Sequence, residues 1–349
     1  MSDVLRNPFR GTGLAGFDLF PKDDPSGVAA LLAQCPAHVQ TPLLDLTELA
    51  RGLGIAQLLI KDERSRMGLG SFKALGAAYA IAREASINVQ NGNWDSALKG
   101  RVYVTASAGN HGLSVAAGAR LFGATAIIYL ARTVPAAFAD RLRAKGALVE
   151  WAGDTYEDSL TAAETAARAG DGMLLSDGSW PGYVDLPTRV MEGYLQLAAE
   201  AGAQIITPPT HIVLQAGVGG LAAAVAAHAR SLWGDAPQII VVEPEYAPAL
   251  IESIRAEKVV TTSGPVSAMG RLDCKTPSMV ALAGLARDAD TFVTITEDEA
   301  AQGVAMLARH GIATTPSGAA GFAAVLAKRF DVDPDSRVLA ILSEGPEDA

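Results

Sequence analysis

Short apolar stretches alternate with glycine-rich turns and helix-like segments over most of this chain of 349 residues. Residues 211–216, HIVLQA, precede the turn GVGG and an alanine-rich segment of helical length. Residues 101–105, RVYVT, precede ASAGNHG and another such segment. Strands that are apolar along their whole length are typical of parallel sheets covered by helices on both faces. The pattern therefore predicts an α/β fold with mostly parallel sheets flanked by helices.

The alternation also predicts where the individual elements lie. The expected strands are residues 58–61, 101–105, 125–130, 148–151, 211–216, 238–243 and 338–342. The expected helices are residues 72–84, a segment ending at residue 122, and residues 135–145, 156–169, 221–232, 297–310 and 317–330.

Length and two breaks in the alternation indicate two lobes. At ~100–200 residues per domain, a chain of this length fits two lobes or one large α/β unit. A polar loop at residues 88–96 and the sequence TPPT at 207–210 interrupt the pattern. We expect residues 80–185 to form a smaller lobe, inserted into a larger, cofactor-binding lobe of residues 1–79 and 186–349.

Charge and composition exclude several partners. The chain has 38 acidic and 28 basic residues, a net charge of −10. This charge repels phosphate backbones, so we expect no nucleic-acid partner. No apolar stretch approaches the ~18–20 residues of a membrane span, and the N-terminus lacks the apolar region of a secretion signal. Two cysteines, Cys35 and Cys274, and no metal-binding motif favour a cytoplasmic protein without a metal site.

The turn Gly217-Val218-Gly219-Gly220 is a candidate phosphate site. Glycines let backbone N–H groups approach a ligand, and the N-terminus of the following helix carries partial positive charge. Residues 217–222 also match the dinucleotide pattern G-x-G-x-x-A, with Glu243 at the distance of a ribose-binding acid. The loop alone does not distinguish a single phosphate from a pyrophosphate, although either is favoured over an empty turn. The similar pattern at residues 11–16 lacks a preceding strand and is expected to be a loop.

Residues 105–112, TASAGNHG, form a second candidate anion site between a strand and a helix. Small residues expose N–H groups there, which suits a carboxylate. The Asn110 amide can donate and accept hydrogen bonds, whereas we expect the His111 ring to be structural. Lys73, in SFKALG, opens a helix beside Phe72. If its ammonium form is disfavoured, the neutral amine is a nucleophile toward aldehydes. Taken alone, a surface lysine is the simpler interpretation.

Together these motifs resemble the fold type II pyridoxal-phosphate enzymes, which are relatives of the tryptophan synthase β chain and of serine and threonine dehydratases. The matching segments run from TPLLDL at residue 41 to LSEG at 342–345 and include KDE, SFKALGAAYA, SAGNHG and GVGG. Within this group the chain is most similar to the diaminopropionate ammonia-lyases, in residues 58–80, in SDGSWPGY from residue 176 and in VEPEYA from residue 242.

The resemblance implies a role for each matched residue. Lys73 would bind pyridoxal 5′-phosphate covalently in a cleft between the lobes, and Lys73 or Asp177 would remove the α proton of a small amino acid. The other implied contacts are Asn110 with the cofactor 3-hydroxyl group, Gly217, Val218, Gly219 and Gly220 with its phosphate, Ser343 or its rival Ser317 with the pyridine nitrogen, and Ser107, Gly109 and His111 with the substrate carboxylate.

The resemblance also implies an activity, with two departures. The expected enzyme is a cytoplasmic, homodimeric ammonia-lyase that eliminates the β substituent of a 2,3-diaminopropionate-like substrate to give a 2-keto acid and ammonia. Ala108 stands where the diaminopropionate ammonia-lyases have an aspartate. The segment 269–278 also departs from their pattern, and its Arg271 and Lys275 could bind a second anionic group or belong to a solvated loop.

Other activities remain open. On the same fold these are a serine, threonine or 3-hydroxyaspartate dehydratase, a β-replacement synthase and a catalytically silent binding protein. From a different class comes an NAD(P)-binding oxidoreductase, which leaves SFKALG and SAGNHG unexplained.

Overall fold

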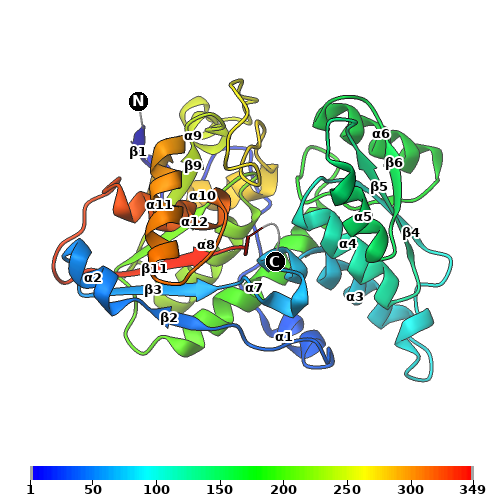
Figure 1. Ribbon diagram of the computed structural model, residues 1–349, viewed down its shortest axis with the longest axis horizontal. Coiled ribbons are helices and arrows are strands. Elements are labelled where there is room, and N and C mark those ends of the chain that lie inside the picture. The colour runs from blue at the N-terminus through cyan, green and yellow to red at the C-terminus, as the bar shows by residue number, and fades with distance from the viewer. Residues whose placement is uncertain (1–2, 347–349) are drawn as a thin grey trace.

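The computed structural model describes residues 3–346, which form two lobes with one sheet each (Figure 1). The strands are β1 (Val4–Arg6), β2 (Leu43–Asp45), β3 (Gln57–Asp62), β4 (Val102–Ala106), β5 (Thr125–Leu130), β6 (Leu148–Trp151), β7 (Met173–Leu174), β8 (His211–Gln215), β9 (Gln238–Pro244), β10 (Thr291–Ile295) and β11 (Arg337–Leu342). The helices are α1 (Ser26–Leu32), α2 (Thr47–Leu53), α3 (Ala77–Asn88), α4 (Asn110–Leu121), α5 (Ala136–Ala144), α6 (Tyr156–Ala169), α7 (Asp185–Gln204), α8 (Gly220–Trp233), α9 (Ala249–Ala256), α10 (Met279–Asp288), α11 (Glu297–Arg309) and α12 (Pro316–Leu326), with short 3₁₀ turns η1 (Arg66–Gly68), η2 (Phe72–Leu75) and η3 (Trp94–Ser96).

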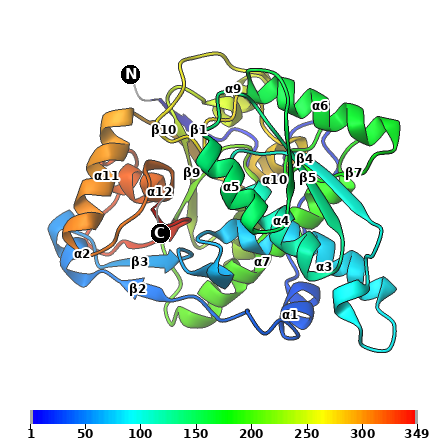
Figure 2. The same cartoon turned by 45° about the vertical axis from the view of Figure 1, so that its right-hand side comes forward.

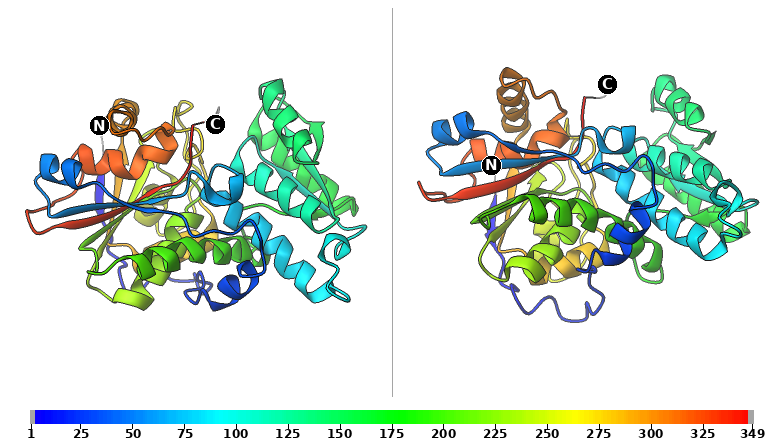
Figure 3. Two further views of the ribbon diagram at one scale, coloured as in Figure 1. Left: turned by 60° about the horizontal axis from the view of Figure 1, so that its bottom comes forward. Right: turned by 90° about the horizontal axis from the view of Figure 1, so that it is seen from below.

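The larger sheet has seven strands in the order β1-β10-β9-β8-β11-β3-β2. Its inner pairs are parallel, and the two edge strands β1 and β2 pair antiparallel. Alternate residues of β11 enter different cores: Leu339 and Ile341 pack with α7, α8 and α10, whereas Val338 and Ala340 pack with α11 and α12. Figure 3 shows these helices on opposite sides of the sheet. Burial on both faces explains why the central strands are apolar throughout.

The smaller sheet has four parallel strands in the order β6-β5-β4-β7 and belongs to the lobe that comes forward in Figure 2. Its strands span residues 102–174, inside the predicted insertion at 80–185. The expected α/β fold with two mostly parallel sheets is thus confirmed. The boundaries at 79/80 and 185/186 stay a prediction.

The helix expected at residues 72–84 is wrong in one respect, because the chain breaks at Gly76. The 3₁₀ turn η2 ends there and α3 begins at Ala77. A Cβ atom on Gly76 would lie 2.6 Å from the Tyr194 ring, so a side chain at this position would collide with α7. The break keeps Lys73 on a short turn instead of a continuous helix.

Several elements were not expected from the sequence, among them β1, β10 and α7, a helix of 20 residues. The pattern G-x-G-x-x-G at residues 11–16 is a loop, as expected, with positive φ at its three glycines. Among residues 3–346 no helix is long and apolar enough to cross a membrane.

Candidate active site

Two glycine-rich loops lie at the carboxyl ends of parallel strands, one in each lobe. Residues 216–219 connect β8 to α8, and residues 107–109 connect β4 to α4. In open α/β sheets ligands bind outside the carboxyl ends of the strands, next to helix N-termini. Both predicted anion sites therefore have the placement that their chemistry requires.

Lys73 and Asp177 meet near both loops, because their charges interact with His111 in α4 and with Cys274, which lies against Gly217. Lys73 lies in η2, Asp177 follows β7, and Lys73 Nζ donates a short hydrogen bond to Asp177 Oδ2 within an ion pair. Each side chain keeps 19% of its surface exposed. Lys73 Nζ also lies 5.3 Å from the ring centroid of Phe72 and 5.7 Å from that of Tyr194.

The charge state of Lys73 differs from the sequence-based expectation. Burial lowers the pKa of Lys73, but the negative charge of Asp177 outweighs it and raises this pKa well above its usual value. Burial disfavours the charged form of Asp177 as well and raises its pKa, but the charges of Lys73 and His111 hold this pKa well below its usual range. The ammonium form of Lys73 is therefore favoured, and the condition for a neutral amine is not met in the protein without a ligand.

The phosphate-site loop has little room for side chains. Gly219 ends the loop with φ of +97°, in the left-handed region that favours glycine. A Cβ atom on Gly217 would lie 3.0 Å from Cys274 Sγ. The Val218 carbonyl accepts a hydrogen bond from the Ser278 N–H at 2.9 Å. Segment 274–278 thus packs against the loop and fixes its conformation. The loop leads directly into α8, which begins at Gly220.

The loop before α4 is stabilised by Ser107. Its hydroxyl accepts hydrogen bonds from the N–H groups of Gly109, at 3.2 Å, and Gly112, at 3.0 Å. His111 Nε2 donates to the Leu175 carbonyl at 2.8 Å, which supports the expected structural role of the ring. Its Nδ1, however, is buried without a hydrogen-bond partner among the described residues.

Asn110 contacts a carboxylate that the sequence analysis did not select. Its Nδ2 donates to Glu344 Oε2, and the Thr315 hydroxyl donates to Glu344 Oε1. Arg271 Nε lies 4.0 Å from Glu344 Oε2. Glu344 is the second residue after β11 and is buried. An acidic residue just after a mostly apolar central strand was the available signal.

The two candidate serines differ in their surroundings. The Ser317 hydroxyl accepts a hydrogen bond from the Arg271 N–H at 3.1 Å. The Ser343 carbonyl accepts one from the Phe72 N–H at 3.0 Å, which places Ser343 next to the turn that carries Lys73. This arrangement favours Ser343 for the role at the pyridine nitrogen, which stays a prediction.

The structure also gives Arg271 and Lys275 different surroundings. Lys275 Nζ donates to the carbonyls of Tyr246 and Pro265, at 2.7 and 3.0 Å, and to Asp273 Oδ1 at 2.6 Å. These bonds occupy its three N–H donors and leave none for an anion in this arrangement. Arg271 lines a cavity whose wall includes residues of both lobes.

Glu243 does not have the exposure that a ribose-binding acid needs. It is buried, and its oxygens accept hydrogen bonds from the N–H groups of Leu250, at 2.7 Å, and Ile251, at 2.8 Å, at the start of α9. Burial raises the pKa of Glu243 to about 8. The residue is a helix cap, which removes the main support for the oxidoreductase alternative.

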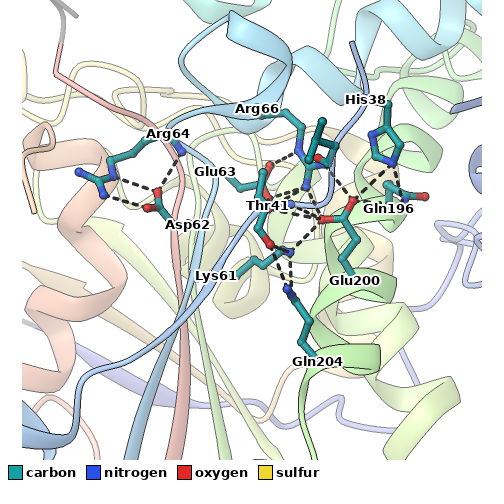
Figure 4. A network of polar contacts seen from close by, with 11 residues as sticks. His38, Thr41, Lys61, Asp62, Glu63, Arg64, Arg66, Gln196, Glu200 and Gln204 are labelled. Carbon is teal, nitrogen blue, oxygen red and sulfur yellow. Dashed lines mark hydrogen bonds and ion pairs between the residues drawn. The ribbon is translucent and has the colours of Figure 1, made fainter. Parts of the chain in front are cut away.

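The KDE motif belongs to a buried charge network (Figure 4). Arg66 in η1 binds Glu63 and Glu200, and Lys61 Nζ lies 2.8 Å from Glu200 Oε2. The Thr41 hydroxyl donates to Glu63 at 2.6 Å. The network joins β3, η1 and α7 directly before the turn that carries Lys73.

Comparisons with known proteins agree with this geometry. A model of the pyridoxal-phosphate-dependent enzyme family matches residues 35–344. Diaminopropionate ammonia-lyase of Salmonella typhimurium is 31% identical over 96% of this chain and 92% of that protein. L-serine dehydratase/L-threonine deaminase of Mus musculus is 30% identical over 66% of this chain and 65% of that protein.

A solved structure extends the likeness to three dimensions. Diaminopropionate ammonia-lyase from Escherichia coli, in complex with D-serine, superposes with a TM-score of 0.88 at 28% identity and covers 99% of this chain and 94% of that one. The chain therefore belongs to the family of pyridoxal-phosphate-dependent enzymes.

Proposed function

We propose that this protein is a pyridoxal-phosphate-dependent ammonia-lyase that eliminates the β substituent of a small amino acid similar to 2,3-diaminopropionate. The products are a 2-keto acid and ammonia. The observation that carries the proposal is the pairing of Lys73 with Asp177 near two glycine-rich loops, one in each lobe, that are the predicted anion sites. Among relatives, the diaminopropionate ammonia-lyases match nearly the whole chain.

The residues present fit the cofactor. The loop 217–220 places backbone N–H groups at the start of α8, where a phosphate is stabilised. Ser71 Oγ, directly before the turn of Lys73, and His111 Nδ1, in the first turn of α4, are buried without hydrogen-bond partners among the described residues. Lys73 Nζ would hold the cofactor, Asn110 would bind its 3-hydroxyl group and Ser343 its pyridine nitrogen. When bound, the cofactor supplies an electron sink that makes the α proton of an amino acid removable.

Asp177 and Lys73 divide the proton chemistry. While Lys73 carries a charge, it holds the pKa of Asp177 low, so Asp177 is a weak base. If Lys73 loses that charge, the largest contribution that opposes burial is gone, so the pKa of Asp177 rises and its basicity increases. The two groups thus titrate as a pair. Whichever of them is unprotonated can remove the α proton, while its partner carries the proton that they share. The 107–112 loop orients the substrate carboxylate.

The test is direct. Purified protein with pyridoxal phosphate should show a visible absorbance band that borohydride abolishes, and mass spectrometry should find the adduct on Lys73. A panel of β-substituted amino acids, both enantiomers, should then yield keto acid and ammonia. Absence of the adduct together with tight NADH binding would refute the proposal. Keto acid from serine or threonine alone would favour the dehydratase alternative.

Assembly and location form part of the same proposal. A homodimer in the cytoplasm is what the family resemblance implies. Light scattering coupled to size exclusion measures the mass against the 36.0 kDa of one chain.

A further inference from the structure

Two buried serines connect the segment of Asp177 to the larger lobe. Ser179 lies two residues after Asp177, inside the predicted insertion at 80–185, and Ser278 directly precedes α10. The exposed fraction is 4% for Ser179 and 1% for Ser278. Their hydroxyl oxygens are 2.7 Å apart, and the Ser179 N–H donates to Ser278 Oγ at 3.2 Å. These contacts satisfy two hydroxyl groups whose burial would otherwise cost free energy.

The start of α10 is capped by Ser179, which is distant in the sequence. A serine directly before a helix ordinarily accepts a hydrogen bond from an N–H group of the first turn. Ser278 occupies that position and makes no such bond. Instead, the Ser179 carbonyl accepts from the Met279 N–H at 2.9 Å, and the Ser179 hydroxyl accepts from the Val280 N–H at 2.9 Å. Capping alone would need only Ser278, so this exchange of partners ties the two segments together.

Ser278 also binds the phosphate-site loop. Its N–H donates to the Val218 carbonyl at 2.9 Å, in the turn between β8 and α8. Helix α10 packs against the same turn, because a Cβ atom on Gly219 would lie 3.1 Å from Ala281 Cβ. The N–H of Ser278 thus holds the loop that would bind the phosphate, and its hydroxyl holds the segment that carries Asp177.

The Asp177 segment is fixed at its other end within the smaller lobe. The Tyr183 hydroxyl accepts from the Ser176 N–H at 3.0 Å and donates to the Leu174 carbonyl, at the end of β7, at 2.8 Å. These bonds place the segment relative to β7. Its place relative to the larger lobe depends on the ion pair with Lys73 and on the serines. The ion pair weakens when Lys73 binds the cofactor, whereas the serine contacts carry no charge that could be lost.

We propose that Ser278 is a positioning residue of the active site: its N–H and its hydroxyl fix the segment of Asp177 against the phosphate-site loop, so that this acid keeps its place while Lys73 exchanges partners. The inference rests on the proposed function and deepens it, because it names the link between the cofactor anchor and the acid. The two arms of the link are chemically different, one a backbone N–H and the other a hydroxyl. Substitutions can therefore separate them.

Ser278→Ala removes the hydroxyl and keeps the N–H that binds Val218. We expect kcat on 2,3-diaminopropionate to fall about ten- to a hundredfold, since a small displacement of a reacting group has an effect of this size. The apparent Kd for pyridoxal 5′-phosphate, titrated into protein without cofactor, should change less than about twofold. In the protein without cofactor the pKa of Lys73 should fall, by less than in Asp177→Asn, because the opposing charge of Asp177 moves away. NMR titration of the labelled lysine measures this shift.

Ser278→Pro removes both arms. The φ of −66° at Ser278 is a value that the proline ring accepts, so the backbone conformation is compatible with the substitution. The ring takes the place of the N–H that binds Val218. This variant should lose turnover as Ser278→Ala does, and in addition the apparent Kd for pyridoxal 5′-phosphate should rise at least about fivefold.

Two further variants separate the link from a loss of stability. Ser179→Ala removes the partner hydroxyl and should also lower kcat and the pKa of Lys73. The double variant should lower kcat no more than about twofold beyond the stronger single variant, because both serines belong to one link. Ser253→Ala is the control: this buried serine donates to Ala249 O at 2.6 Å and accepts from the Val260 N–H at 2.9 Å, within α9 and the segment after it. It should change none of these quantities, and thermal melts verify that every variant folds.

The results distinguish a failure of the inference from a failure of the proposed function. If Ser278→Ala retains wild-type kcat and the wild-type pKa of Lys73, the serines only stabilise the fold and the inference is wrong. The same holds if Ser278→Ala weakens cofactor binding as much as Ser278→Pro, or if Ser253→Ala has equal effects. If no β-substituted amino acid reacts with the wild-type protein, the proposed function fails. The titration of Lys73 and the two values of Kd then decide on the link.

Discussion

Two lysine–carboxylate pairs of this protein have the same chemistry and different surroundings. Lys61 is fully buried, and its three donors all find oxygens: Thr41 O at 2.7 Å, Gln204 Oε1 at 2.9 Å and Glu200 Oε2 at 2.8 Å. Lys73 keeps part of its surface exposed and lies between Asp177 and two aromatic rings. A lysine whose donors are all bound stabilises a fold, whereas a partly exposed lysine that is held by one acid can exchange that partner for a ligand.

The largest expected difference between the pairs is in turnover. Lys73→Ala should lower kcat by at least about four orders of magnitude and abolish the cofactor adduct, because it removes the amine that binds the cofactor. Lys61→Met should retain the adduct, measured by mass spectrometry after borohydride reduction. Near wild-type turnover of the Lys73→Ala protein would contradict the distinction between a catalytic Lys73 and a structural Lys61.

Substitution of Asp177, the acid that pairs with Lys73, has the next largest effect. Asp177→Asn should lower kcat by about two to four orders of magnitude, which is the usual contribution of a positioned acid or base. In the protein without cofactor it should also lower the pKa of Lys73, because burial then acts without the opposing charge. NMR titration of the labelled lysine measures this shift. Asp140→Asn, at an exposed pair with Arg143, is the control and should change neither quantity.

The acid of the buried pair should affect stability instead. Glu200→Gln leaves Arg66 and Lys61 without their shared countercharge and should cost about 3–5 kcal/mol in the free energy of unfolding. Glu252→Gln breaks an exposed pair with Arg255 and should cost less than about 1 kcal/mol. Urea titrations compare the two. Equal losses would mean that burial of the network contributes little.

The rates on L- and D-substrates test whether the Lys73–Asp177 pair serves only one face of the substrate. Ala108, where the resemblance to the diaminopropionate ammonia-lyases implies an aspartate, can neither accept nor donate a proton through its side chain. We therefore expect L-substrates to react about a hundredfold faster than D-isomers. Keto-acid assays on enantiomerically pure substrates measure the ratio, and Ala108→Asp should reduce it. Similar rates on both enantiomers would contradict the prediction.

The most gradual effect concerns how buried carboxylates respond to pH. Arg66 and Lys61 overcome burial to lower the pKa of Glu200 to about 2, so its contribution to stability is present above about pH 4.5 and is lost as the pH falls toward 2. Glu243, capped by N–H groups, has a pKa raised to about 8. Its contribution is full below about pH 4.5 and is lost as the pH rises through 8, by at most about 1.4 kcal/mol per pH unit. Glu243→Gln should flatten that part of the curve of unfolding free energy against pH; an unchanged curve would place the pKa near its usual value.

Much of the fold was predictable because its central strands are buried on both faces. Strands β5 and β6 lie where the apolar runs placed them, and β8 and β11 differ by one residue at one end. Helix α7 was missed, although its length makes it a main element of the larger lobe. The break at Gly76 was also missed, because it depends on the ring of Tyr194, more than a hundred residues away.

The sequence by itself determined the two glycine loops, the lysine between them and the family, because loop chemistry is local and its motifs are contiguous. The tertiary structure decided the charge of Lys73, the engagement of Lys275, the helix-capping role of Glu243 and the place of Glu344 beside Asn110. Each of these depends on a partner that is distant in sequence or on burial, and electrostatic interactions fall with distance in space, not along the chain. A residue list can therefore name the groups of this site, whereas their protonation and their partners follow only from the folded arrangement.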